Sequence, residues 1–195
     1  MQIEVTKKEQ LQTNTWSGGT TTQLVIYPKN AQYKNLDFTF RISTATIDVE
    51  ESTFTVLPNV TREIMVLDGE LLIQHKNYYT KQLKKFDSDS FLGDWHTTSI
   101  GKATDFNVMT RGNAKATVEG IYLSEKENKE LPLDSNLIAI YVYKGEVCME
   151  QPSLKIVLLQ GDIALIYNEQ EGETIKLHAV EAAEIALAHI YTELV

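Results

Sequence analysis

Residues 105–112, DFNVMTRG, carry polar or functional side chains at every second position. Successive side chains of a β-strand point to opposite faces, so Phe106 and Val108 would lie together on an apolar face. The opposite face would carry Asp105, Asn107, Met109 and Arg111. We expect this second face to be either a solvated surface or the polar floor of a pocket.

Arginine is rare in this chain, which makes each arginine a candidate for specific binding. Only Arg41, Arg62 and Arg111 occur, and the other fifteen basic residues are lysines. The planar guanidinium group can bind a carboxylate through two parallel hydrogen bonds. A local positive pocket of this kind would attract a small anion despite the net charge of -9. The alternative is that each arginine pairs inside the protein with an acidic residue such as Asp105 or Glu63.

Other site chemistries find little support in the sequence. The four histidines contain no His-x-His pair, so we expect no metal site. Cys148 lies between Val147 and Met149 and is interpreted as a buried, inert thiol. The Gly18–Gly19 pair lacks the lysine and the spacing of a phosphate-binding loop, so we expect no nucleotide and no cofactor.

A metal-free enzyme is the alternative function. Asp94 and His96 would share one face if the segment Asp94–Trp95–His96 were a strand, and the carboxylate would then orient the imidazole. His96, or a tyrosine, would act as the acid/base group of an isomerase or lyase. This hypothesis requires His96 to face the same cavity as Arg62.

Composition restricts the partners and the cellular setting. An acidic chain without a basic run is a poor nucleic-acid binder. No stretch approaches the roughly 20 apolar residues of a membrane-spanning helix, and the N-terminus lacks the apolar core of a signal peptide. One cysteine allows no internal disulfide, which favours the cytoplasm. A sheet face could also pair two copies of the chain as a homodimer.

The sequence predicts an all-β fold, because period-two and β-rich stretches separated by turn residues dominate it. A helix at 180–188 is the main alternative, and a final strand suits that segment equally well. The stretch LDGELLIQ at 67–74 is echoed by YKGEVCME at 143–150. Such a repeat of strand, Gly-Glu turn and strand indicates a duplicated β unit. Cupin barrels show this pattern, so we predict a bicupin, with a β-sandwich as the alternative.

We divide the chain into an N-terminal cupin-like unit at 1–120, which would hold the ligand pocket, and a C-terminal unit at 121–195. The two units could pack closely enough to form one compact domain. The three arginines all lie in the first unit.

Several blocks resemble the HutD/Ves family of bicupins in order and approximate spacing. They cover most of the first 112 residues and read NTWSGGTTTQL (14–24), FRISTATI (40–47), FTVLPNVTREIMVLDGE (54–70), FLGDW (91–95) and DFNVMTRG (105–112). The family's Trp-x-Asn-Gly-Gly-Gly stretch is shorter here and lacks the asparagine. Its double arginine is Thr110–Arg111 in this chain.

The resemblance implies a compact, metal-free bicupin that binds a small anion in its N-terminal barrel. By this analogy, Arg62 in the P-x-x-x-R turn would bind the ligand's carboxylate. Trp16 would form an aromatic wall, and the cavity would be lined or braced by Arg41, Ser43, Asn107, Met109 and Arg111. The resemblance further implies a regulatory role in histidine utilisation, with N-formylglutamate, urocanate or a related acid as the ligand.

Overall fold

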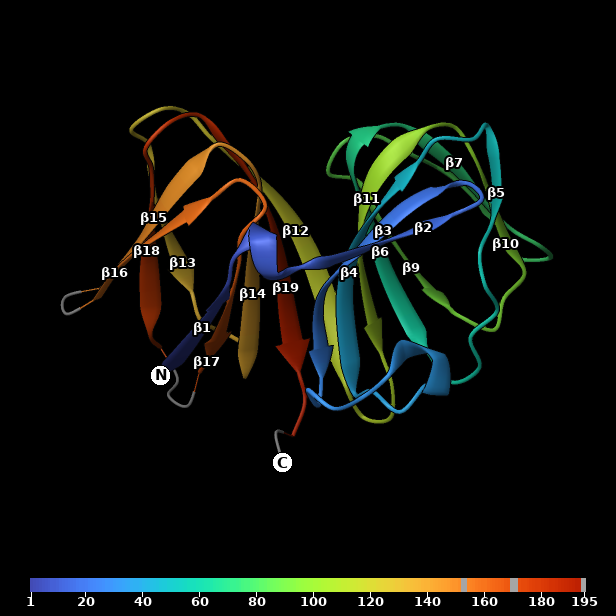
Figure 1. The fold of residues 1–195 in the computed structure, drawn as a ribbon, viewed down its shortest axis with the longest axis horizontal. Helices are drawn as coiled ribbons and strands as arrows, with labels where there is room; N and C mark the ends of the chain where they lie inside the picture. The colour runs from blue at the N-terminus through green and yellow to red at the C-terminus, as the bar shows by residue number, and fades with distance from the viewer. Residues whose placement is uncertain (152–153, 169–171, 194–195) are drawn as a thin grey trace. The chain divides into compact units, whose positions relative to one another are not determined.

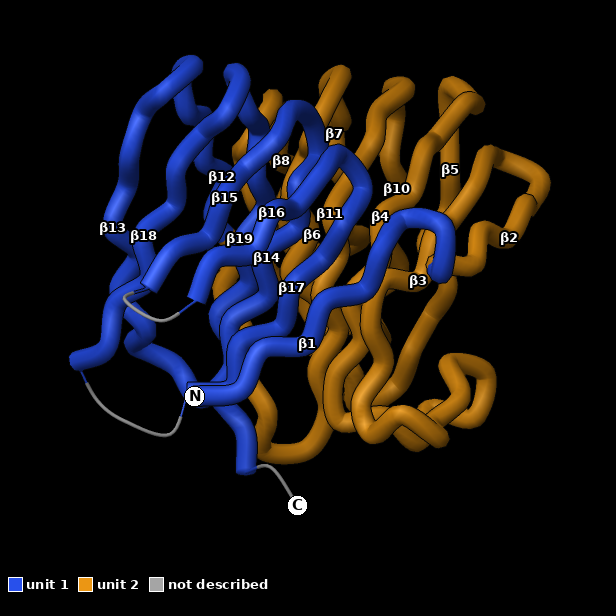
Figure 2. The backbone as a smooth tube through the Cα atoms, turned by 60° about the vertical axis from the view of Figure 1, so that its left-hand side comes forward, with its two compact units in different colours: residues 1–10, 119–195 blue, residues 11–118 orange. Residues whose placement is uncertain are grey.

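The chain forms two compact β units, shown in different colours in Figure 2. A computed structural model describes residues 1–151, 154–168 and 172–193. Unit 1 contains residues 1–10 and 119–195, and unit 2 contains residues 11–118. The observed limit at 118/119 lies two residues from the predicted boundary, whereas the first ten residues belong with the C-terminal half.

Unit 2 consists of a six-stranded and a four-stranded antiparallel sheet (Figure 1). In spatial order, the larger sheet contains β2 (Gln12–Trp16), β3 (Gly19–Tyr27), β4 (Phe40–Ile47), β11 (Ala103–Thr110), β6 (Thr61–Gly69) and β9 (Ser88–Leu92). The smaller sheet contains β5 (Glu51–Thr53), β10 (Thr97–Ile100), β7 (Leu71–His75) and β8 (Thr80–Leu83). A 3-10 turn, η2 (Tyr33–Asn35), lies between β3 and β4.

Unit 1 repeats this plan with one five-stranded and one four-stranded sheet. The first contains β1 (Gln2–Thr6), β17 (Ile163–Tyr167), β14 (Leu137–Lys144), β19 (Ala183–Tyr191) and β12 (Lys115–Leu123). The second contains β13 (Asn128–Pro132), β18 (Thr174–Ala179), β15 (Glu146–Gln151) and β16 (Leu154–Leu159). The short η1 (Lys8–Gln10) follows β1.

The N-terminal strand completes the C-terminal unit. Gln2 pairs with Tyr167 and Thr6 with Ile163, so β1 forms an edge of the five-stranded sheet. Beyond the strand, the Lys7 ammonium lies 2.7 Å from a carboxylate oxygen of Asp162. The backbone N–H of Lys8 donates to the other carboxylate oxygen. Residues at the start of the chain are therefore fixed to a strand near its end.

The two units differ in the size of their buried apolar clusters. In unit 1, eighteen buried apolar side chains from both sheets form one cluster, with Ile138, Ile140 and Leu187 fully buried. In unit 2, the corresponding apolar cluster is smaller and is built around Ile64, Leu71 and Ile73. Unit 2 also contains the cavity described below, which is lined by charged, polar and aromatic side chains.

The predicted repeat has a stereochemical basis in two glycines. Gly69 ends β6 with a φ of 77°, and Gly145 separates β14 from β15 with a φ of 82°. A β-carbon at Gly69 would lie 2.3 Å from the carbonyl oxygen of Lys102, and one at Gly145 would lie 2.3 Å from that of Ala182. Each unit therefore uses the same glycine turn against the backbone of a neighbouring segment.

The all-β prediction is confirmed, since the described residues form strands, turns and two short 3-10 turns. The segment at 180–188 belongs largely to strand β19, so the alternative of a helix there is wrong. The burial of residues 183–191 shows no two-faced pattern, because six of the nine are buried, four of them in succession. Cys148 is buried in β15, as predicted.

We expect Gly69→Ala and Gly145→Ala each to destabilise the protein by about 3 kcal/mol, because a positive φ and a clash with backbone add together. Gly112→Ala is the matched control. Its φ is 64°, but no atom lies within 4 Å of the added carbon, so we expect a loss of about 1 kcal/mol. Urea unfolding would measure all three, and equal losses would contradict the importance of the backbone contact.

Candidate functional site

Three neighbouring strands of unit 2 bring the predicted binding residues into register. On β4, β11 and β6, Arg41 lies opposite Met109, and Met109 lies opposite Arg62. Two residues further along β11, Asn107 lies opposite Ser43. The sequence alternation at 105–109 therefore becomes one polar wall, because residues two apart on a strand share a face.

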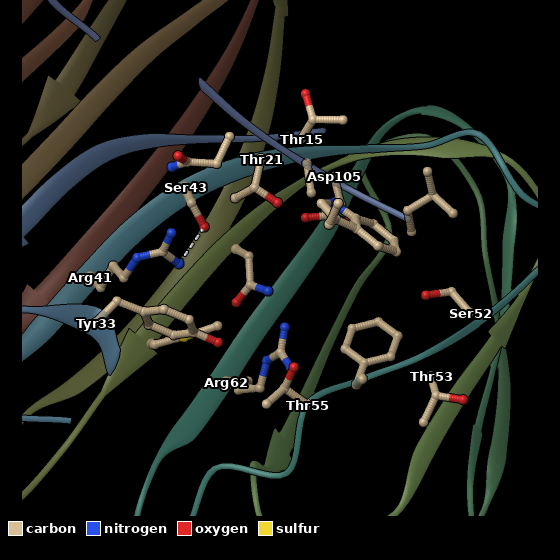
Figure 3. A pocket seen from close by; sticks show the side chains of 17 residues that line it. Thr15, Thr21, Tyr33, Arg41, Ser43, Ser52, Thr53, Thr55, Arg62 and Asp105 are labelled. Carbon is tan, nitrogen blue, oxygen red and sulfur yellow. Dashed lines mark hydrogen bonds between the residues drawn. The ribbon is translucent and has the colours of Figure 1, made fainter. Parts of the chain in front are cut away.

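This wall borders a cavity of about 430 Å³ within unit 2 (Figure 3). Ligand pockets in proteins commonly enclose roughly 300–1,000 Å³, so the volume suits a small molecule. Further lining comes from the end of β2 in the same sheet, from η2, and from β5 with the two residues that follow it. From these elements come Asn14, Thr15, Trp16, Tyr33, Ser52, Thr53, Phe54 and Thr55.

Arg41 is held by three neighbours. Its Nε donates to Oε1 of Gln23 at 2.9 Å, and its Nη1 donates to Oγ of Ser43 at 3.0 Å. The guanidinium carbon lies 4.4 Å from the ring centre of Tyr33. Burial lowers the pKa of Arg41. Arg41 is therefore a fixed positive charge in the cavity wall, as Figure 3 shows.

Arg62 is buried to a similar degree but has no polar partner. Its side chain is 6% exposed, Nε is without a hydrogen bond, and the guanidinium forms no ion pair with any described residue. The guanidinium carbon instead lies 4.7 Å from the ring centre of Phe54 and 5.4 Å from that of Phe91. Burial lowers the pKa of Arg62 to about 10, so the group remains a cation at neutral pH. A buried cation without a partner is unusual in a native protein and indicates a ligand site.

Asp105 and Asn107 add two more unsatisfied atoms. Asp105 is 3% exposed and Asn107 is 5% exposed, and Oδ1 of each lacks a hydrogen-bond partner. Burial raises the pKa of Asp105 from 3.8 to about 7, although the nearby Arg62 charge opposes this shift. Asp105 is thus partly protonated at neutral pH, and the cavity retains a net positive charge from the two arginines.

The cavity brings together six of the seven predicted binding residues. Arg41, Ser43, Arg62, Asn107 and Met109 line it from the large sheet, and Trp16 lines it from β2, with 37% of the tryptophan exposed. Arg111 is not among the lining residues. Strand β11 ends at Thr110, so the alternation that places Asp105, Asn107 and Met109 on one face does not extend to Arg111.

Sequence reasoning missed the aromatic contacts of the two arginines. Tyr33 reaches Arg41 from a 3-10 turn, and no local pattern in the sequence indicates that turn as part of a site. Phe54 lies within a family-like block but was not singled out. Asp105 lies on the predicted polar face, but the alternative that it pairs with an arginine inside the protein is not seen, because no nitrogen of any described arginine or lysine lies within 4.0 Å of its carboxylate.

His96 does not have the geometry that the enzyme hypothesis requires. The side chain is exposed, and Asp94 lies in the turn between β9 and β10, so the two residues do not share a strand face. Neither residue lines the cavity that contains Arg62. The expected orientation of His96 toward Arg62 is therefore wrong.

In the sequence, His75 stands two residues beyond Ile73 near the end of a strand, which predicts a surface histidine, and this prediction is wrong. His75 is buried at the end of β7, where it follows Leu71 and Ile73 on the inward face. Nδ1 lies 2.8 Å from Oγ1 of Thr97, and Nε2 lies 2.9 Å from Oδ2 of Asp89. These contacts connect three strands, β7, β10 and β9, across unit 2.

Solved structures with the same arrangement define the class of fold. A conserved protein of unknown function from Pseudomonas aeruginosa PAO1 aligns with a TM-score of 0.82 and 15% identity, over 98% of this chain and 100% of that one. HutD from Pseudomonas fluorescens SBW25 aligns with a TM-score of 0.72 and 16% identity, over 99% and 100%. The pirin YhhW from Escherichia coli, solved with nickel(II), aligns with a TM-score of 0.69 and 12% identity, over 96% and 98%. The protein is a bicupin, as predicted.

The sequence itself assigns the family. The HutD family profile matches residues 8–187, so the chain belongs to the HutD family. A search of curated proteins gave no match. Among the described residues, no helix has the length and hydropathy needed to cross a membrane.

We expect Asp105→Asn to stabilise the protein at pH 8. A carboxyl group with a folded pKa of about 7 and an ordinary value of 3.8 binds its proton more tightly in the native state. Wild-type stability therefore falls as pH rises from about 4 to 7, by about 4 kcal/mol at most. The asparagine side chain of Asp105→Asn does not ionise, so the variant avoids this loss. Its greater stability over the wild type should disappear near pH 4.

Chemical unfolding between pH 4 and 8 would measure this difference. Asp94→Asn is the control, because Asp94 is exposed and should leave the pH profile unchanged. A pH profile of Asp105→Asn parallel to that of the wild type would show that Asp105 ionises normally.

Proposed function

We propose that this HutD-family bicupin binds a small carboxylate in the cavity of unit 2, with Arg62 as the group that binds the anion. The observation that carries this proposal is the buried Arg62 guanidinium, which has no hydrogen bond or ion pair among the described residues. A carboxylate would supply the missing acceptors through a charge-assisted, bidentate contact. Arg41 would add a second positive charge, already oriented by Ser43 and Gln23.

The remaining lining suits an organic acid with a short carbon skeleton. Trp16, Tyr33 and Phe54 offer apolar surface, while Asn107 offers an unsatisfied amide oxygen. Most ligand sites combine an apolar lining with a few fixed polar groups in this manner. The overall charge of -9 makes general attraction of anions weak, so the local arginines would provide both attraction and selectivity.

Candidate ligands follow from the family. N-formylglutamate, urocanate or a related acid of histidine utilisation would fit a HutD-type protein, and the Pseudomonas fluorescens HutD structure was obtained in a formate condition. We further propose a regulatory role, in which the bound acid reports the level of a pathway intermediate. The cytoplasm is the setting we propose, in keeping with a single buried cysteine.

Isothermal titration calorimetry with N-formylglutamate and urocanate tests the proposal. We expect at least one acid to bind the wild type, and Arg62→Met to weaken that binding by about 2 kcal/mol or more, which is roughly thirtyfold. Lys115→Met removes an exposed positive charge outside the cavity and should bind like the wild type.

Thermal unfolding of both variants should accompany the titrations, since Arg62→Met removes an unpaired buried charge and should stay folded. If neither acid binds, or if Arg62→Met binds as well as the wild type, the proposed function is wrong.

A further inference from the structure

Asp105 is the one acidic side chain among the residues that line the cavity, and binding of an anion at Arg62 gives it no role of its own. Its carboxyl group is almost completely buried, and Oδ1 has no partner. No basic nitrogen of a described residue lies within 4.0 Å of it, so it is not half of an internal ion pair. An acidic group is thus held in the wall of a site that attracts anions.

We propose that Asp105 determines which acids the cavity accepts: in its protonated form it donates a hydrogen bond to an oxygen acceptor of the same ligand whose carboxylate binds Arg62. This inference rests on the proposed function, because it requires an anion at Arg62. When Asp105 is ionised in the free protein, each ligand enters together with one proton from solvent. The O–H bond of the Asp105 carboxyl group forms as the bond that held this proton in hydronium or in the buffer acid breaks.

Electrostatics in the cavity favours a protonated Asp105 when an anion is bound at Arg62. Two carboxylates that share a dry site cannot both remain ionised without a large cost. Arg62 is the group that lowers the pKa of Asp105 in the free protein. A ligand anion paired with Arg62 cancels that effect, so binding should raise the pKa of Asp105 above about 7.

Few other titratable groups face Asp105. Arg41 on β4, Arg62 on β6 and Tyr33 on η2 are the titratable lining residues besides Asp105 itself. The lining residues from β2, β3 and the segment at 52–55 carry no titratable side chain. Among the lining residues, Asp105 is therefore the one carboxyl group that can take up a proton when a ligand binds.

The strand register sets the backbone positions of the two groups, and the long Arg62 side chain brings its charge close enough to Asp105 for each to shift the pKa of the other. Along β11, Asp105 and Met109 are four residues apart, and Met109 is the residue opposite Arg62. Asn107 lies between them on the same face, with a free amide oxygen. The ligand should therefore carry its carboxylate at one end and an oxygen acceptor several bonds away, as in oxo acids, amido acids and dicarboxylic acids. A simple alkanoate would leave Asp105 without an acceptor.

A pair of matched acids tests this inference. Pentanoate has one carboxylate, whereas 4-oxopentanoate has a carboxylate and a ketone on a chain of the same length. Calorimetry at pH 6 and pH 8, in phosphate and in Tris, measures affinity and the number of protons taken up. Asp105→Asn keeps the shape and a hydrogen-bond donor but cannot take up a proton. Asp94→Asn is the matched control at an exposed aspartate.

For the wild type we expect uptake of about 0.9 proton per bound 4-oxopentanoate at pH 8 and about 0.1 at pH 6, with about tenfold weaker binding at pH 8. The ketone should improve affinity about fivefold over pentanoate, the equivalent of one neutral hydrogen bond. Asp105→Asn should bind with no proton uptake and equal affinity at the two pH values, and Asp94→Asn should behave like the wild type.

A carbon-13 NMR titration of the Asp105 carboxyl group in the wild type gives a second measurement that needs no variant. The pKa should rise when 4-oxopentanoate is added. Binding that depends on Arg62 but shows no proton uptake and no change in the Asp105 titration overturns this inference and leaves the proposed function intact. Absence of binding by all the acids tested overturns both.

Discussion

A buried guanidinium group without a polar partner is the constraint on which unit 2 depends. Transfer of a charge from water into a protein interior is costly unless other groups replace the lost hydration. For Arg62, the faces of Phe54 and Phe91 offer part of that replacement, and the Asp105 charge offers another part at a distance. The hydrogen-bonding capacity of the group remains unused. The barrel is thus organised around a positive charge to which no described residue offers a hydrogen-bond acceptor.

The two units share one β architecture but differ in the side chains that line their interiors. In unit 1, apolar side chains from both sheets fill the interior. In unit 2, arginine, serine, asparagine and aspartate replace apolar residues along the inner faces of β4 and β11. Glycine turns at Gly69 and Gly145 keep the backbone plan the same in both. The duplicated scaffold therefore tolerates a partly polar cavity in one unit and holds an apolar cluster of eighteen buried side chains in the other.

Much of this organisation could be predicted from local patterns. Alternation at 105–109 predicted a polar face, and the rarity of arginine drew attention to Arg41 and Arg62. Alternation along 71–75 places His75 on the inward face with Leu71 and Ile73, but its position near a strand end favours the surface. Arg111 lies beyond the last residue of β11, and strand ends are poorly marked in sequence. Tyr33 reaches the site only because the folded chain brings η2 beside β4. No local sequence pattern indicates this tertiary contact.

The placement of β1 has a consequence for the order in which the protein is made. Its pairing partner β17 begins at Ile163, so β1 cannot form these hydrogen bonds until the ribosome has synthesised the chain as far as β17. Unit 2, which is complete at residue 118, does not depend on that event. Because domains commonly fold as they emerge during synthesis, the ligand-binding barrel can close early. Strand β1 meanwhile remains without its partner, and its insertion is a late step in assembly of the second barrel.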